Sequence, residues 1–170
     1  RAQITRELGA PPERLFAEFA TDAFAAASLG QVHRARLPSG AAVVVKIQYP
    51  GVEETVVQDL KNIRALIATL VRIGRDVMGQ KIDATEVARE LEDRLREELD
   101  YVKEAANLIR FRSLFADDPE VVIPEPVPEF SSRRVLTMHA IEGYPLNDIL
   151  APGVDQELKD WVAIKYFQVL

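Results

Sequence analysis

The chain has 170 residues, of which 48% are hydrophobic, and it carries a formal net charge of −6 from 21 basic and 27 acidic side chains. This hydrophobic content excludes wholesale disorder, and the acidic balance excludes a generally basic surface for nucleic acid. The sequence has no cysteine and only His33 and His139 as histidines, so it excludes a disulfide framework and gives no basis for a cysteine or histidine metal cluster.

The apolar stretches and the two ends of the sequence bear on membrane attachment and completeness. Charged residues such as Arg64, Arg72 and Arg75 interrupt the longest apolar stretches, so no membrane-spanning segment is predicted. No signal peptide is visible. Because the sequence starts at Arg1 rather than Met and stops within an apolar, helical-looking run, WVAIKYFQVL, we expect a fragment of a longer protein.

The first 21 residues are predicted to be helical. Pro11 and Pro12 stand where prolines commonly begin a helix, and that helix would bury Leu15, Phe16 and Phe19.

Residues 22–49 form the most distinctive stretch of the sequence. An alanine-rich turn at 25–30 leads into an alternating run at 31–37, a hairpin turn at 38–40 and a β-branched run at 41–47. Lys46 is the one charged residue in that last run. Its side chain either reaches solvent at a strand edge or has a functional role. The preceding loop favours a functional role, because backbone N–H groups in a loop of small residues can approach a polyanion. A lysine on the next strand can then reach the phosphates of that polyanion.

Two long helices are predicted next, at 52–78 and 83–115. The first has a helical spacing of apolar residues, namely Val56, Leu60, Ile63, Ile67 and Leu70. The second has a capping pattern at its start, with Asp83 followed by Glu86. Its apolar stripe consists of Leu91, Leu95, Leu99, Val102 and Ala106.

A row of carboxylates, Glu97, Asp100 and Glu104, lies roughly opposite this stripe at spacings of three and four. Glu97 fits a solvated face. Glu104 differs, because its row continues through apolar residues that predict a buried stripe, namely Leu108, Phe111 and Phe115. A buried carboxylate needs a cationic partner, so the sequence predicts one for Glu104.

The remaining residues are predicted to form shorter elements. Residues 116–130 are a proline-punctuated linker with a short strand at 121–123, and a further strand follows at 133–138. A turn at Gly143 precedes a helix that begins at 146–150, and a final helix starts near Gln156.

Three segments in this order, AAASLGQVH, VVVKIQYPGV and EELDYVKEAAN, closely resemble the UbiB/ADCK family of atypical protein-kinase-like proteins, from about Leu15 to the C-terminal end. The resemblance implies an α+β fold, with a kinase-like N-lobe at 22–141. This lobe would be an antiparallel sheet with an αC-like helix carrying Glu104 and a long helix inserted between that helix and the strand of Lys46. Residues 1–21 would be an N-terminal helical extension, and residues 142–170 the hinge exit and the start of a helical C-lobe.

The resemblance implies roles for two charged residues. Lys46 stands where kinase-like folds place the lysine that pairs with the α- and β-phosphates, and Glu104 where they place its orienting glutamate. A structural ion pair without a ligand is the alternative.

The resemblance also implies that the alanine-rich loop replaces the usual glycine-rich loop, with cofactor-binding positions at Ala25, Ala26, Ala27, Ser28, Gly30 and Gln31. Alanine avoids positive φ, so the loop should be stiffer than a glycine-rich one, restrict how phosphates are seated and limit ordinary protein-kinase turnover. For Ser28 and Gln31, local turn and strand hydrogen bonding is the alternative.

Glu98 and Asp100 match the family's E-x-D element, which the resemblance links to an upstream K-x-G-Q segment absent here. On a regular helix Glu98 points well away from Glu104. A joint role for Glu98 and Asp100 therefore needs the missing segment or an irregularity in the helix.

Residues 137–141 resemble the hinge between kinase lobes, where backbone groups of His139 and Ile141 would read an adenine. Alternatively, His139 is a loop-edge histidine. No metal role is expected for His33.

The catalytic-loop residues and the metal-binding D-F-G aspartate of kinases do not occur in this sequence. The resemblance implies that the parent protein is an ATP-dependent atypical kinase or ATPase, with ATP or ADP and Mg²⁺ whose ligands lie outside these residues. It also implies a link to quinone or isoprenoid-lipid metabolism, with lipids, quinone-pathway proteins or a membrane surface as partners and no nucleic acid. The protein would be cytoplasmic or peripheral to a membrane on its cytoplasmic side. The alternatives are a pseudokinase that binds nucleotide without phosphotransfer and a helical interaction protein that binds no nucleotide.

Overall fold

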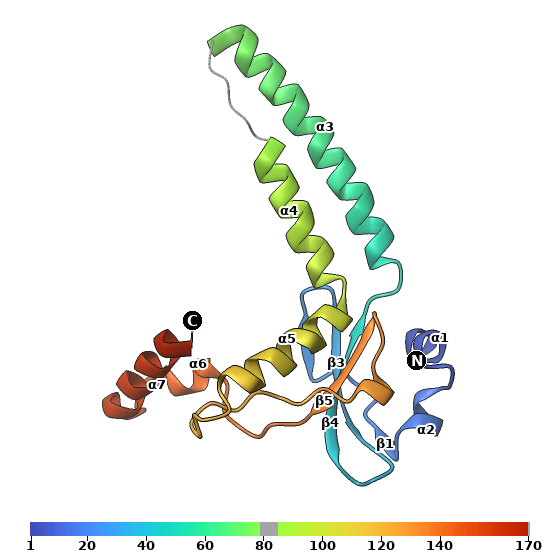
Figure 1. The fold of residues 1–170 in the computed structure, drawn as a ribbon, viewed down its shortest axis with the longest axis vertical. Coiled ribbons are helices and arrows are strands. Elements are labelled where there is room, and N and C mark those ends of the chain that lie inside the picture. The colour runs from blue at the N-terminus through green and yellow to red at the C-terminus, as the bar shows by residue number, and fades with distance from the viewer. Residues whose placement is uncertain (79–84, 170) are drawn as a thin grey trace. The chain divides into compact units, whose positions relative to one another are not determined.

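The computed structural model describes residues 1–78 and 85–169, which divide into two units, Arg1–Ala140 and Ile141–Leu170 (Figure 1). The helices of the first unit are α1 (Ala2–Leu8), α2 (Pro12–Leu15), α3 (Val52–Met78), α4 (Thr85–Glu98), α5 (Tyr101–Leu114) and the 3₁₀ turn η1 (Pro128–Phe130). Its strands are β1 (Glu18–Phe19), β2 (Ala25–Ala27), β3 (Gly30–Arg36), β4 (Ala42–Gln48) and β5 (Val135–His139).

The five strands form one antiparallel sheet in the order β1-β3-β4-β5, with β2 also paired to β3. A hairpin joins β3 to β4, and Gly40 supplies the positive φ of its turn. Lys46 lies opposite Val32 on β3 and Leu136 on β5. The lysine is therefore held in the middle of the sheet, with a paired strand on each side.

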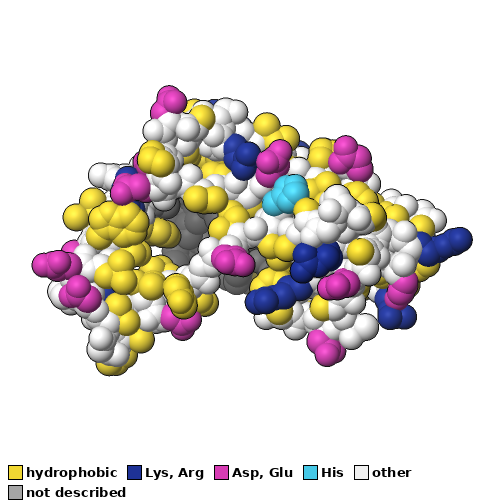
Figure 2. All heavy atoms as spheres, turned by 90° about the horizontal axis from the view of Figure 1, so that it is seen from below, with side chains coloured by type: hydrophobic (Ala, Val, Ile, Leu, Met, Phe, Trp, Pro, Cys, Tyr) yellow, Lys and Arg dark blue, Asp and Glu magenta, His cyan; other side chains and the backbone are white. Residues whose placement is uncertain are grey.

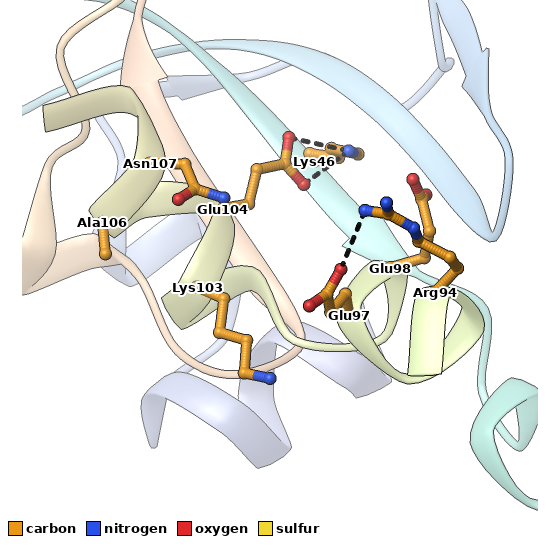
Figure 3. Close-up of a pocket in the computed structure, with 8 residues that line it drawn as sticks. All are labelled: Lys46, Arg94, Glu97, Glu98, Lys103, Glu104, Ala106 and Asn107. Atoms are coloured by element: carbon orange, nitrogen blue, oxygen red, sulfur yellow. Dashed lines mark hydrogen bonds and ion pairs between the residues drawn. The ribbon is translucent and has the colours of Figure 1, made fainter. Parts of the chain in front are cut away.

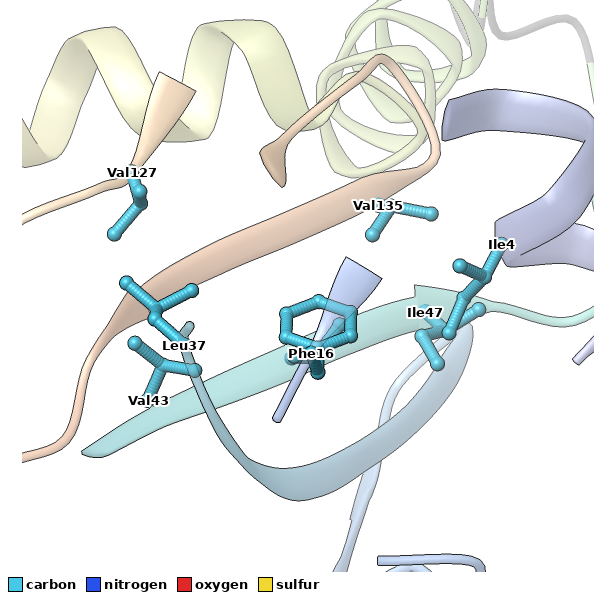
Figure 4. Packing of buried hydrophobic residues seen from close by; sticks show 8 residues of the cluster. Ile4, Phe16, Leu37, Val43, Ile47, Val127 and Val135 are labelled. Atoms are coloured by element: carbon cyan, nitrogen blue, oxygen red, sulfur yellow. The ribbon is translucent and has the colours of Figure 1, made fainter. Parts of the chain in front are cut away.

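One face of the sheet carries the core of this unit (Figure 4). Val43, Val45 and Ile47 point to it from β4, because successive side chains of a strand point to opposite faces. Ile4 of α1 and Phe16 after α2 pack against the same face and are almost fully buried. The alternation that buries these residues places the side chain of Lys46 on the other face of the sheet.

Helix α3 begins and ends where the apolar spacing predicts, and Leu60 is its buried anchor. Helices α3 and α4 lie side by side as a hairpin (Figure 1). The prediction of one helix over 83–115 is wrong, because α4 and α5 are separate helices that break at Leu99 and Asp100. The predicted cap at Asp83 lies outside the described residues.

Two contacts cause this break. Asp100 has an extended backbone, and its Oδ1 atom accepts hydrogen bonds from the backbone N–H groups of Val102 and Lys103, which caps α5. The Gln48 side chain donates to the carbonyl oxygen of Leu99, so that this carbonyl does not bond within a continued helix. The predicted apolar stripe is consequently divided: Leu99 is buried, while Val102 is 58% exposed.

Three further predictions of local structure need correction. Residues 1–21 are not helical throughout, because Glu18 and Phe19 pair with β3 as strand β1. The alanine-rich segment is mostly the strand β2, and the turn itself contains only Ser28 and Leu29. No strand forms at 121–123. The linker instead pairs with β5 at one bridge, between Pro126 and Met138.

The second unit contains α6 (Leu146–Ile149) and α7 (Gln156–Val169), as the sequence predicts. Gly153 has a positive φ in the segment between them. Among the described residues of the chain, no helix is long and apolar enough to cross a membrane.

Basic and acidic side chains are interspersed over the face of the molecule drawn in Figure 2.

Candidate functional site

The centre of the site is an ion pair between β4 and α5 (Figure 3). The Nζ atom of Lys46 donates to both carboxylate oxygens of Glu104, at 2.9 Å to Oε1 and 2.8 Å to Oε2. The side chains are 19% and 36% exposed, so the pair is partly screened from water yet open on one side. The cationic partner predicted for Glu104 is therefore present, and it is Lys46.

The sequence predicted a cationic partner for Glu104 because the helix row below it was expected to be buried, and this reason is wrong in part. The row below Glu104 is not a buried stripe: Leu108 and Phe115 are half-buried, and Phe111 is 42% exposed. The rings of Phe111 and Phe115 stack on each other, with their centroids 6.3 Å apart. Glu104 is thus held by its direct contact with Lys46 rather than by burial of the whole helix face.

Helix α5 is fixed at its first turn by contacts to the sheet. The backbone N–H of Tyr101 donates to the carbonyl oxygen of Arg133 at 3.0 Å. Gln48, two residues after Lys46 on β4, donates from Nε2 to the carbonyl oxygen of Leu99 at 2.9 Å. Because these contacts position the start of α5 relative to β4, they also determine where Glu104 meets Lys46.

Tyr101 lies directly beside the ion pair. Its ring is 2% exposed, and the Nζ atom of Lys46 lies 4.7 Å from the ring centroid. Burial raises the pKa of the Tyr101 hydroxyl, and the negative charges of Glu104 and Glu98 raise it further. Sequence reasoning missed this residue. The signal that could have found it is its position three residues before Glu104, on the same face of the helix.

The break between α4 and α5 brings Glu98 to the site. A cavity of about 580 Å³ is lined by Lys46, Glu104 and Glu98 together with Arg94, Glu97, Lys103, Ala106 and Asn107 (Figure 3). The prediction that Glu98 points away from Glu104 holds only for a continuous helix and is wrong for this structure. The break between α4 and α5 is the helix irregularity that a joint role of Glu98 and Asp100 requires. Asp100, the other member of the element, is the N-cap of α5.

Glu97 and Arg94 form the outer part of this cavity. Glu97, predicted on a solvated face, is exposed, and its Oε2 atom lies 3.6 Å from Nη1 of Arg94. Lys103 extends away from the Lys46–Glu104 pair in Figure 3. The cavity therefore carries both signs of charge, with the cation of Lys46 at its inner end.

The alanine-rich segment forms a tight hairpin against β4. Ala25 and Ala26 are exposed, as are Ser28 and Gln31, and neither polar side chain bonds to another described group. The alternative of local side-chain hydrogen bonding is thus not seen for Ser28 or Gln31. Ala27 is half-buried. Ser28 is free to meet a ligand, but Gln31 pairs with Ile47 on β4 and therefore lies on the opposite face of the sheet from Lys46.

Gly30 has a packing reason for being glycine. A Cβ atom at this position would lie 2.2 Å from the carbonyl oxygen of Ile47 and 2.9 Å from its carbonyl carbon. The absence of a side chain lets β3 approach β4 beside Lys46, and this keeps the hairpin turn close to the strand of the lysine.

The two histidines differ in their surroundings. His33 is buried, its Nδ1 atom lies 3.0 Å from the carbonyl oxygen of Ala20, and its ring stacks on Phe19. This is a structural histidine, and no group of metal-ligating side chains occurs among the described residues.

The proposed hinge residues lie in different units. His139 ends β5 in the first unit, and its backbone N–H donates to the carbonyl oxygen of Glu125 at 2.8 Å. Ile141 begins the second unit and is 48% exposed. Their joint role toward an adenine stays a prediction.

A second charged cluster, which sequence reasoning missed, lies near the same end of the sheet, where the backbone N–H of Gln48 donates to the carbonyl oxygen of Arg134. Arg134 contacts Glu53 at the start of α3 at 2.6 Å and Glu7 of α1 at 3.3 Å. The hydrogen bond from Arg134 holds the pKa of the Glu53 carboxyl below its ordinary value, against the opposing effect of burial. No local pattern reveals this cluster, because its members are far apart in the sequence.

A family model described as the ABC1 atypical kinase-like domain matches residues 1–170, the whole chain. This chain belongs to that family. The resemblance to UbiB/ADCK proteins is thereby confirmed, and the antiparallel sheet with its paired lysine and glutamate is the sheet of an ABC1 domain.

Individual relatives agree with this assignment. The probable protein kinase UbiB of Marinobacter nauticus is 37% identical over 151 residues, which are 89% of this chain and 27% of that protein. The mitochondrial atypical kinase COQ8 of Saccharomyces cerevisiae is 38% identical over 160 residues, or 94% of this chain and 30% of that protein. The chain thus spans less than a third of either relative.

One solved structure is also similar to most of this chain. Rv3197 of Mycobacterium tuberculosis, determined as a complex with erythromycin, matches with a TM-score of 0.78 and 33% identity over 92% of this chain and 38% of that one. The ABC1 domain described here therefore has a kinase-like fold, and homologues named as kinases place it in a kinase-like enzyme family.

Proposed function

We propose that this ABC1 domain is the ATP-binding lobe of an atypical kinase or ATPase of the UbiB/ADCK type. The observation that carries the proposal is the ion pair between Lys46 on β4 and Glu104 on α5. Such a pair, reached across a sheet-helix interface, is how kinase-like folds orient the lysine that contacts nucleotide phosphates.

The surroundings of the pair fit an anionic ligand with an attached base. Lys46 uses its ammonium for two bonds to Glu104, which leaves a third N–H donor for a phosphate oxygen. The exposed turn after β2 offers the side chain of Ser28, whereas Gln31 pairs with Ile47 and so points to the other face of the sheet from Lys46. The His139 N–H is already bonded to Glu125, so we assign the His139 carbonyl oxygen to the base.

In this proposal ATP or ADP binds with Mg²⁺, which neutralises phosphate charge, and the ligands of the metal lie outside these residues. Glu98 belongs to the wall of the site, and Asp100 acts through the start of α5. Lys46 and Glu104 orient the phosphates and make no covalent bond.

We also propose that the parent protein acts in quinone or isoprenoid-lipid metabolism, with lipids, quinone-pathway proteins or a membrane surface as partners. The similarity to UbiB and COQ8 supports this link. A cytoplasmic location or a peripheral one at a membrane is part of the same proposal.

A second candidate function is a regulatory nucleotide-binding module that does not transfer phosphate. It is favoured by the alanine hairpin, because Ala25–Ala27 pair fully with β3 and leave a turn of only Ser28 and Leu29. A loop this constrained has little freedom to follow a transferring phosphate. Turnover of ATP by the parent protein separates the two functions.

The test is calorimetric binding of Mg-ATP and Mg-ADP to the full-length parent protein and its variants. We expect Lys46→Met to bind about a hundredfold more weakly and Glu104→Gln about tenfold more weakly, both still measurable, because each removes part of the phosphate contact. Lys61→Met, which removes an exposed lysine of α3, is the control and should bind as the wild type does. Equal binding by all folded variants would refute the site assignment, and no binding by the wild type would favour an interaction protein.

A further inference from the structure

Lys46 is held by two groups of α5, not by one. Glu104 contacts the ammonium through both carboxylate oxygens, and the ring of Tyr101 faces it at 4.7 Å from Nζ to the centroid. Tyr101 and Glu104 are three residues apart, so one face of the helix presents an aromatic ring and a carboxylate to the same cation.

The position of the ring is independent of the ion pair. Tyr101 is 2% exposed, and its backbone N–H is bonded to the Arg133 carbonyl oxygen at 3.0 Å. Asp100 caps the helix directly before it. Tyr101 also lines a separate cavity of about 150 Å³, together with Val102 and Ile109. The sheet and the helix cap therefore fix Tyr101 even where Glu104 is removed.

The geometry of the ring suits a cation. An ammonium within about 6 Å of an aromatic centroid is attracted by the negative face of the ring, and the attraction grows as the ammonium loses water. The Lys46 side chain is only 19% exposed, so the contact is partly desolvated. A flexible four-carbon side chain would otherwise sample several rotamers across the cavity.

We infer that Tyr101 is a positioning residue for Lys46: its ring holds the ammonium at the inner end of the cavity, where the remaining N–H donor faces an incoming phosphate. The inference deepens the proposed function and rests on it for the ligand, whereas the contact between ring and ammonium does not depend on that function. The Tyr101 ring and the Glu104 carboxylate together give α5 two contacts with Lys46, so any outward movement of the helix releases both.

The first test does not use nucleotide. Protons that lie over an aromatic face resonate upfield, so the ε-methylene signal of Lys46 in the full-length protein with labelled lysine should be shifted upfield. Its assignment comes from its loss in Lys46→Met. We expect Tyr101→Phe to keep the shift and Tyr101→Leu to abolish it. An unshifted signal in the wild-type protein, or a shift retained in Tyr101→Leu, overturns the inference.

The second test measures Mg-ADP affinity in the same proteins. Tyr101→Leu should bind about tenfold more weakly and Tyr101→Phe within about twofold of the wild type, because only the ring is needed. In the Lys46→Met background, Tyr101→Leu should cause no further loss. Tyr166→Leu, a change of an exposed tyrosine on α7, is the control.

The outcomes separate the two claims. If Tyr101→Leu weakens binding equally with and without Lys46, or if Phe behaves as Leu does, Tyr101 acts structurally and the inference is wrong while the nucleotide site stands. If no form binds nucleotide, the proposed function fails, and the methylene signal still decides whether the ring positions the lysine.

Discussion

Gln48 and Leu99 are joined by a hydrogen bond of 2.9 Å between the Nε2 atom of Gln48 and the carbonyl oxygen of Leu99. Gln48 is 1% exposed and follows Lys46 by two residues, while Leu99 lies at the break between α4 and α5. This bond therefore connects the strand of the lysine to the origin of the helix that carries its glutamate.

Replacing Gln48 by Met should lower the free energy of unfolding by about 1 kcal/mol, because the buried carbonyl of Leu99 loses its donor. The loss stays modest because Oε1 of Gln48 is itself buried and has no partner among the described residues, so the change also removes an unsatisfied group. Urea denaturation measures the change. Gln58→Met, at an exposed position of α3, is the control, and equal effects of the two would contradict a special role for Gln48.

Gly30→Ala should destabilise the protein by about 1–3 kcal/mol, because the new methyl group would overlap the backbone of Ile47 rather than a flexible side chain. β3 must then move away from β4 next to Lys46, so weaker nucleotide binding is also expected. Thermal denaturation gives the first quantity and calorimetry the second. Gly143→Ala is the matched control, since a methyl group there meets nothing within 4 Å. A neutral effect of Gly30→Ala would show that the strands are not constrained at this point.

Asp100→Ala should cost about 1 kcal/mol of stability through loss of the N-cap of α5, whereas Asp100→Asn should cost little, because its amide oxygen can accept the same bonds. Chemical denaturation tests this, and nucleotide affinity separates structure from chemistry. Should Asp100→Asn remain fully stable yet lose nucleotide binding, the charge of Asp100 would have a role beyond capping.

The stability of the protein should fall in acid partly through Glu53. Its pKa in the folded state lies below the ordinary value of 4.5, chiefly because Arg134 donates a hydrogen bond to the carboxylate. A lowered folded-state pKa means that the contribution to stability is complete above the unfolded-state pKa and is lost as the pH falls through the folded-state pKa. The stability difference between the wild type and Glu53→Gln should therefore shrink from about pH 4.5 downward.

Urea denaturation across this pH range measures that difference. Glu54→Gln, a change of the exposed neighbouring glutamate on α3, serves as the control for removing a carboxylate from this turn. A Glu53→Gln difference that stays constant with pH would mean that the carboxylate does not gain its stabilisation from Arg134.

The sequence was informative where a local pattern determines the structure. The period-2 alternation of β4 places Val43, Val45 and Ile47 in the core and Lys46 on the other face, and the helical spacing from Val52 gives the bounds of α3. The pairing of Lys46 with Glu104 followed from a family resemblance and from the need of a shielded carboxylate for a cation.

Sequence reasoning failed where contacts between residues far apart in the chain determine the local structure. The apolar and acidic rows of 83–115 are consistent with one helix, and only the contact with Gln48, 51 residues from Leu99, together with the cap at Asp100, breaks it. Strand β1 was missed because two residues carry no periodicity. Tyr101 was not singled out, because its contact with Lys46 depends on the strand that lies across from it.

The break has a topological consequence for the helical hairpin α3–α4. The chain leaves the sheet immediately after Gln48 and comes back beside it at Leu99, and the Gln48 side chain donates to the Leu99 carbonyl, so the hairpin is closed at its base. Because the two ends of the inserted hairpin are held together, its length adds little to the entropic cost of bringing Lys46 and Glu104 into contact. Whole helical turns could be added to or removed from α3 and α4 as a matched pair while Lys46 and Glu104 stay in register. The hairpin is a module whose size is uncoupled from the geometry of the pair.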